Sequence, residues 1–167
     1  MKRLMSVVLS MVVVLMMCCG AMAQECFNAQ GSIVVPCIYS TYISASDWTA
    51  PHMVISNITD KEVQCKVKVF DQDGIDVTYL GYVFSGGEPL NVISSGIGDF
   101  DIPAYSTRVY AFNRDGGKKR VAGYATIEWK SDDTKLRNAL VGGVFRARGF
   151  ASSRSDSERL INNGQPF

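Results

Sequence analysis

Three carboxylates surround one glycine in V-F-D-Q-D-G-I-D-V, residues 69–77. Acidic side chains at this spacing could bind calcium, which an EF-hand holds with ligands at loop positions 1, 3, 5 and 12 around a glycine at position 6. With Gly74 at position 6, positions 1 and 12 are Val69 and Leu80, whose side chains offer no oxygen. Asp-Gly between two strand-like runs instead predicts a hairpin turn, because glycine accepts a positive φ. A looser calcium site is the alternative, formed by Asp71, Asp73 and Asp76.

Catalytic chemistry has little support in the residue pattern. His52 is the single histidine, which excludes a metal site built from several histidines. There is no G-x-S-x-G, no phosphate-binding glycine loop and no Cys-x-x-Cys. We therefore expect no enzyme and no cofactor, with a hydrolase that uses His52 as the remaining enzymatic alternative.

Aromatic residues offer a binding surface. Alternation along a strand turns some of them outward, where they can stack on sugars or anchor a protein interface. The competing interpretation is that they belong to the core and edges of a sandwich. The candidate binding aromatics are Tyr39, Tyr42, Trp48 and Tyr124.

The first 23 residues have the three parts of a secretory signal: basic Lys2-Arg3, an apolar run from Leu4 to Met17, and Ala21-Met22-Ala23. The apolar run is shorter than the ~20 residues of a membrane span. Cys18 or Cys19 would be the lipid attachment site of a lipoprotein, a minority interpretation because bulky Met17 precedes them.

Cleavage after Ala23 removes two of the 17 basic residues and none of the 16 acidic ones, which leaves a net charge of −1. This balance argues against nucleic acid as a partner. We expect a secreted or periplasmic protein, in which Asn57-Ile58-Thr59 also matches a glycosylation sequon.

Three cysteines follow the signal, and export favours disulfides. Strict alternation in E-V-Q-C-K-V-K-V, residues 62–69, puts Cys65 on one face with three valines, which predicts a buried thiol. Cys26 and Cys37 are then the expected pair, and a bond between Cys37 and Cys65 is the alternative.

From residue 38 onward, short runs rich in Val, Ile, Tyr, Thr and Phe alternate with Gly, Asp, Asn and Pro clusters. This spacing predicts an all-β, antiparallel sandwich. Asp115-Gly116-Gly117 repeats the hairpin signal. The expected strands are 38–44, 52–58, 62–70, 76–84, 98–102, 106–112, 120–130, 136–147 and 157–162. The expected domains are a signal peptide at 1–23, an N-terminal segment with a disulfide loop at 24–50 and the sandwich at 51–167.

Three segments carry a resemblance to known families: I-S-N-I-T-D-K-E-V-Q-C-K-V-K-V-F-D-Q-D-G (55–74), I-P-A-Y-S-T-R-V-Y-A-F (102–112) and G-Y-A-T-I-E-W (123–129). They resemble immunoglobulin-like sandwich domains of exported bacterial proteins. Their arrangement is also similar to the sensory rhodopsin transducer family, small β-sandwiches that assemble as oligomers. The resemblance implies a fold and supplies no binding residues.

The expected function is therefore that of an exported, non-enzymatic sandwich that binds a protein or forms a homo-oligomer at the cell envelope or outside the cell. Strand addition at an edge strand such as 136–147 would be one way to bind a neighbour. A glycan-binding module is the alternative, because outward aromatics also stack on sugars.

Overall fold

The computed structural model describes residues 27–112, 120–149 and 154–167. Every ladder in this part of the chain is antiparallel, and the helical content of these residues is limited to two short 3-10 turns. The elements are β1 (Gly31–Ser44), β2 (Asp47–Asn57), β3 (Val63–Phe70), η1 (Thr78–Leu80), β4 (Gly81–Ser85), β5 (Val92–Ser95), β6 (Asp99–Ile102), β7 (Thr107–Phe112), β8 (Arg120–Lys130), β9 (Leu140–Gly149), β10 (Arg154–Leu160) and η2 (Ile161–Gly164). The prediction of an all-β chain is confirmed.

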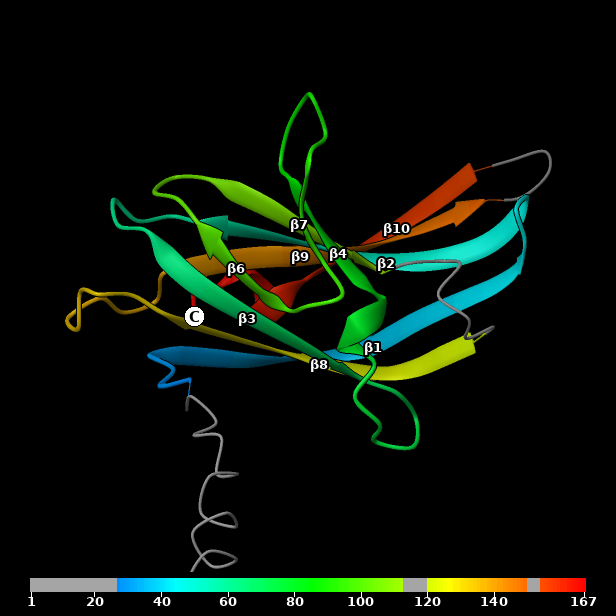
Figure 1. The fold of residues 1–167 in the computed structure, drawn as a ribbon, viewed down its shortest axis with the longest axis horizontal. Coiled ribbons are helices and arrows are strands. Elements are labelled where there is room, and N and C mark those ends of the chain that lie inside the picture. The colour runs from blue at the N-terminus through cyan, green and yellow to red at the C-terminus, as the bar shows by residue number, and fades with distance from the viewer. Residues whose placement is uncertain (1–26, 113–119, 150–153) are drawn as a thin grey trace, which may run out of the picture.

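The strands form two layers, visible one above the other in Figure 1. The first sheet has the order β1-β8-β3-β6, and the second has the order β5-β4-β7-β2-β9-β10. The hairpin of β1 and β2 joins the two sheets at one side. At the other side the backbone of Gly96 donates to Gly81 in the second sheet, and Gly98 accepts from Val67 in the first. Together these connections bring the antiparallel sheets close to a barrel.

The core lies between the sheets because alternation puts one face of each strand inside. Val63, Cys65, Val67 and Val69 of β3 are fully buried, so the prediction of a buried Cys65 is confirmed. On the second sheet, the inward row runs across four strands and pairs Val83, Tyr110, Met53 and Val144 in register.

Most predicted strands are present, and the differences follow from pairing. Residues 31–50, predicted to precede the sandwich, form β1 and the start of β2. The predicted strand 76–84 is instead a 3-10 turn followed by β4, and β5 lies between the predicted strands 76–84 and 98–102, where no strand was expected. The prediction that 136–147 is an edge strand is wrong, because β9 pairs with β2 on one side and β10 on the other.

Neither Asp-Gly signal joins two paired strands. At Gly74 the turn forms and closes one bridge between Phe70 and Asp76, after which the chain crosses to the other sheet. Asp115-Gly116-Gly117 lies outside the described residues. The strands on either side of it do not form a hairpin, since β7 pairs with β2 and β4 while β8 pairs with β1 and β3.

Candidate functional site

The outer face of the first sheet is polar, as expected for an antiparallel sheet with one face in water. Its cross-strand pairs of β3 and β8 join Gln64 to Lys130, Lys66 to Glu128 and Lys68 to Thr126. Lys66 also lies 3.5 Å from Asp99 of the neighbouring strand. Apart from exposed Val34 on β1 and the Phe70–Tyr124 pair at one end of β3 and β8, this face has the composition of a solvated surface.

The outer face of the second sheet is different, because apolar and aromatic side chains replace the polar ones. One row runs in register through Tyr82, Ala111, His52 and Phe145, on β4, β7, β2 and β9. The adjacent outward row joins four apolar positions: Phe84, Val109, Val54 and Gly143. We call this surface the aromatic face and define it by Trp48, Ala50, His52, Val54, Tyr82, Phe84, Val109, Ala111 and Phe145.

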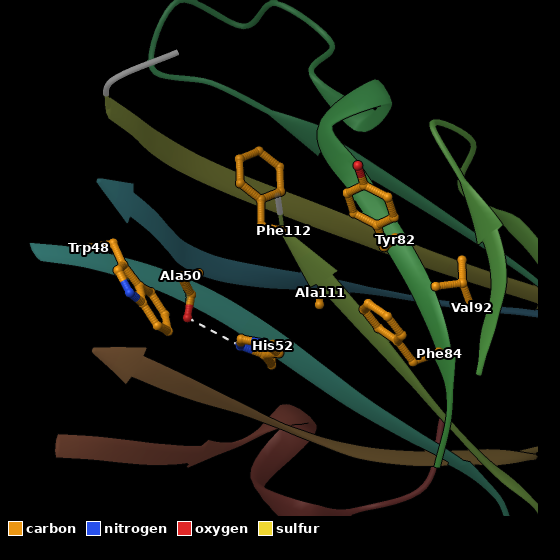
Figure 2. Close-up of a pocket in the computed structure, with 8 residues that line it drawn as sticks. All are labelled: Trp48, Ala50, His52, Tyr82, Phe84, Val92, Ala111 and Phe112. Atoms are coloured by element: carbon orange, nitrogen blue, oxygen red, sulfur yellow. Dashed lines mark hydrogen bonds between the residues drawn. The ribbon is translucent and has the colours of Figure 1, made fainter. Parts of the chain in front are cut away.

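A pocket of about 330 Å³ lies on the aromatic face (Figure 2). Small Ala50 and Ala111 form its floor, because larger side chains around them leave both alanines buried although they point outward. The residues that line the pocket are Trp48, Ala50, His52, Tyr82, Phe84, Val92, Ala111 and Phe112.

Ring contacts hold the walls of this pocket. The His52 imidazole stacks on the Phe145 ring, with centroids 4.7 Å apart and planes 10° from parallel. His52 Nδ1 lies 3.3 Å from the Ala50 carbonyl oxygen. Tyr82 and Phe84, two residues apart on β4, have ring centroids 6.2 Å apart. These contacts reduce the freedom of the rings before anything binds, which lowers the entropic cost of binding.

The pocket lining is chemically simple. Its polar side-chain groups are the imidazole of His52, the phenol of Tyr82 and the indole of Trp48, and it includes no Ser, Asp, Glu, Lys or Cys. A hydrolase that uses His52 would need a nucleophile or a carboxylate beside the imidazole. An apolar or aromatic group of a partner is the ligand that this lining suits best.

The connection between β4 and β5 projects from the body of the molecule (Figure 1). It leads to Val92, which lines the pocket at the start of β5. We call this connection and the first two residues of β5, residues 86–93, the flap. Its base is closed by hydrogen bonds from the backbone of Ser85 to Asn91 and from the backbone of Asn91 to the Ser85 hydroxyl, both 2.9 Å. Leu90 and Val92 are each 58% exposed and Ile93 is 44% exposed. The flap therefore presents apolar side chains to solvent.

The predicted binding aromatics are divided among different places. Trp48 lines the pocket, and Tyr42 pairs with it across the β1–β2 hairpin. The Tyr39 ring lies 5.5 Å below the Arg146 guanidinium, away from the pocket. Tyr124 stacks on Phe70 over the first sheet, with centroids 5.1 Å apart. Of the four candidate aromatics, Trp48 is therefore the one that lines the pocket.

Sequence reasoning missed Phe84, Phe145 and the alanines of the pocket floor. The alternation of Tyr82 and Phe84 around buried Val83 was the available signal on β4. No comparable signal marks Phe145, because the apolar residues 139–145 do not alternate with polar ones.

The acidic turn is held together by its own backbone. Asp71 is buried, and its Oδ1 accepts hydrogen bonds from the backbone N–H groups of Asp73 and Ile75, each at 3.0 Å. Asp76 Oδ1 accepts from the N–H of Thr78 at 2.9 Å. Across the described ranges, no three His, Cys, Asp or Glu side chains gather as a metal site requires. The observed role of these carboxylates is to stabilise the turn.

The residues of the glycosylation sequon form structural hydrogen bonds within the fold. Asn57 is 2% exposed, and its Nδ2 donates to the carbonyl oxygens of Lys61, Ile102 and Pro103 at 2.7–3.1 Å. Its Oδ1 accepts from the backbone N–H and the hydroxyl of Thr59. A glycan on this amide is incompatible with the folded structure.

The two described cysteines are not bonded to each other: Cys37 is exposed and Cys65 is buried. Burial raises the pKa of the Cys65 thiol far above its usual range, and the negative charge of Asp99 adds to the effect. The bond predicted between Cys37 and Cys65 as the alternative is therefore absent.

The expected pair of Cys26 and Cys37 stays a prediction, because Cys26 lies outside the described residues. The next residue, Phe27, has Lys130 Nζ 5.0 Å from its ring, at the end of β1 where Gly31 pairs with Trp129.

Comparison with known proteins identifies a shared fold. No family model matches the chain, and no curated protein matches its sequence. The chain is similar to the crystal structure of Thermotoga maritima 1070, with a TM-score of 0.54 and 9% sequence identity over 84% of this chain and 99% of that one. None of the described helical segments is long and apolar enough to cross a membrane.

Proposed function

We propose that this chain is an exported, non-enzymatic protein-interaction module whose aromatic face binds a protein. The observation that carries the proposal is the contrast between the two outer faces. The first sheet shows mainly Gln, Lys, Glu and Thr to solvent, with Val34 and the stacked Phe70–Tyr124 pair as its apolar positions. The second shows mainly Trp, Tyr, Phe, Val and Ala. An antiparallel sheet with water on one side normally has polar residues there, and an exposed apolar surface with a polar surround is typical of an interface.

The chemistry of the pocket favours a protein over a sugar. Interface cores are rich in aromatic residues and poor in charged ones, and the aromatic face has this composition. A sugar would also need several polar groups placed around it, and the lining offers three. Stacking of Trp48 or Tyr82 on a sugar ring is the observation that keeps a glycan-binding module as the second candidate.

The same proposal includes export and an immunoglobulin-like sandwich. Residues 1–23 have the pattern of a cleaved signal, and two antiparallel layers around one core agree with the sandwich architecture and with the resemblance to the transducer family. We expect the exported form to begin at Gln24. The intact mass of the exported protein identifies its first residue, and a start at Cys18 or Cys19 would identify a lipoprotein instead.

Site-specific photocrosslinking in cells that export the full chain tests the binding face. A photoreactive residue replaces Phe84 on the aromatic face, and a matched one replaces Thr126 on the first sheet, since both positions are half-buried. We expect a discrete protein adduct from position 84 and none from position 126. An absence of adducts at both positions, or equal adducts at both, would overturn the proposal.

Two further assays address the alternatives on the purified mature chain. Saturable binding on a glycan array that is lost in Tyr82→Ala would establish the glycan module in place of the protein partner. A hydrolytic activity that is lost in His52→Ala would establish the enzyme.

A further inference from the structure

We propose that the partner of the aromatic face is a second copy of this chain, and that the flap of each copy packs on the aromatic face of the other. This inference rests on the proposed function, because it names the protein that the face binds. It is carried by the chemistry of two surfaces of the same molecule, by the charges on them and by their combined area.

The flap and the pocket have complementary chemistry. The flap projects from the sheet and carries Leu90, Val92 and Ile93, which are between 44% and 58% exposed. Val92 also lines the pocket of its own copy, so Leu90 is the side chain offered to the second copy. The pocket beside it is a hollow of about 330 Å³ with an alanine floor, large enough for a leucine or isoleucine side chain. Interfaces are commonly stabilised by one apolar anchor that fills such a hollow.

A twofold symmetric dimer covers the flap and fills the pocket of both copies at once. In a symmetric dimer the same patch is used by both subunits, so each projecting flap finds one hollow and no flap is left exposed. A foreign partner would have to supply both a projection for the pocket and a cover for Leu90.

The charge distribution permits this self-association. The two outward rows contain no Asp, Glu, Lys or Arg between Tyr82 and Phe145 or between Phe84 and Gly143. The nearest acidic side chains are Glu158, which pairs with Phe145 from β10, and Glu88 on the flap. Two copies can therefore meet over these rows without placing like charges opposite one another when both glutamates stay at the rim of the contact. The first sheet is a poor surface for this contact, since Lys66, Lys68 and Lys130 would each lose solvent.

The area is sufficient only when the flap takes part. The shorter strands set the size of the aromatic face, because β4 has 5 residues and β7 has 6. Four strands about 4.8 Å apart over about five residue steps of 3.3 Å give a face of roughly 320 Å². Two such faces bury about 640 Å², which is below the usual range of 1,200–2,000 Å² for a specific interface. In the proposed dimer, reciprocal packing of the two flaps supplies the remaining area of about 600 Å².

The test uses the mature full chain, light scattering and analytical ultracentrifugation. We expect a reversible dimer, whose Kd rises about tenfold or more in Leu90→Asp on the flap and in Phe84→Asp on the face. Ile75→Asp is the matched control, because Ile75 is 55% exposed on the distant acidic turn, and its Kd should match the wild type. Circular dichroism establishes that each variant is folded.

Mixing the two variants gives an outcome that is specific to reciprocal packing. The Phe84→Asp copy keeps an intact flap and the Leu90→Asp copy keeps an intact face, so the mixture restores one complete contact. We expect the mixed pair to bind more tightly than either variant alone and less tightly than the wild type. If Leu90→Asp does not fold, Leu90→Ser takes its place in the same measurements.

Three results would overturn the inference: a wild-type monomer at every concentration, a dimer unaffected by both variants, or a mixture no tighter than its components. The proposed function fails separately. A monomeric chain whose position 84 crosslinks to a different protein retains the protein-binding face, whereas a chain that crosslinks to nothing loses both.

Discussion

The indole nitrogen of Trp129 donates a 2.9 Å hydrogen bond to the backbone carbonyl oxygen of Phe167, 38 residues away. The backbone of Phe167 also exchanges two hydrogen bonds with Leu140, at 2.9 and 3.1 Å. All three side chains are buried, so this contact ties residues 161–167 to β8 and β9 at one end of the core. The tail is thus an integral part of the fold.

Phe167→Ala should lower the free energy of unfolding by about 3 kcal/mol, because it removes a buried ring and leaves a cavity in the core. Urea denaturation followed by tryptophan fluorescence measures the change. Gln165→Ala, at an exposed position in the same segment, is the control and should change stability by less than about 0.5 kcal/mol. Equal effects of the two substitutions would show that the tail does not contribute to the core.

Asn57→Ala should destabilise the fold by about 2 kcal/mol. The substitution leaves the carbonyl oxygens of Lys61, Ile102 and Pro103 without their shared donor and removes the acceptor of Thr59. Thermal unfolding measures the loss, and Asn91→Ala at an exposed position is the control. A melting temperature equal to that of the wild type would refute the role of Asn57 as a hub between two turns.

Alanine substitutions at two glycines with equally open surroundings can distinguish the cost of backbone strain from the cost of a steric clash. A Cβ added to Gly74 or to Gly87 meets no atom within 4 Å, but only Gly74 has a positive φ, +76°. Gly74→Ala should therefore cost about 1 kcal/mol, whereas Gly87→Ala should be neutral or stabilising by about 0.5 kcal/mol. Chemical denaturation of both variants measures the change in the free energy of unfolding. A change of the same sign in both variants would contradict the turn geometry.

Stability should fall as the pH rises above about 8.5, the usual pKa of a cysteine thiol. Burial raises the pKa of Cys65 in the folded chain, so the unfolded chain ionises first. The contribution of Cys65 to the free energy of unfolding is complete below pH 8.5 and decreases as the pH rises toward the higher pKa of the folded chain. The decrease is about 1.4 kcal/mol between pH 7 and 9.5.

Denaturation in reducing buffer at both pH values measures this loss, and Cys65→Ala should reduce it by the same amount. Measurements stop at pH 9.5 because burial also raises the pKa of Tyr110, which adds a second loss above about pH 10. A variant with the same pH dependence as the wild type would contradict the assignment to Cys65.

Local pattern determined the strands and the burial of Cys65. Alternation with a period of two is a property of one strand, so β3 and β8 could be recognised from residues 62–70 and 120–130 alone. The Asp71 turn was likewise a local feature, because its carboxylate bonds residues two and four positions away. Such interactions need no knowledge of the rest of the chain.

Only the tertiary structure decided which strands are neighbours and which faces stay outside. The row from Tyr82 to Phe145 takes its residues from four strands, and its register depends on pairings between positions up to 93 residues apart, such as His52 with Phe145. On β2 both alternating sets include apolar residues, Met53 and Ile55 on one face and Val54 on the other, so alternation does not determine the inner one. Long-range pairing settles that choice, because a strand's burial depends on what packs against it.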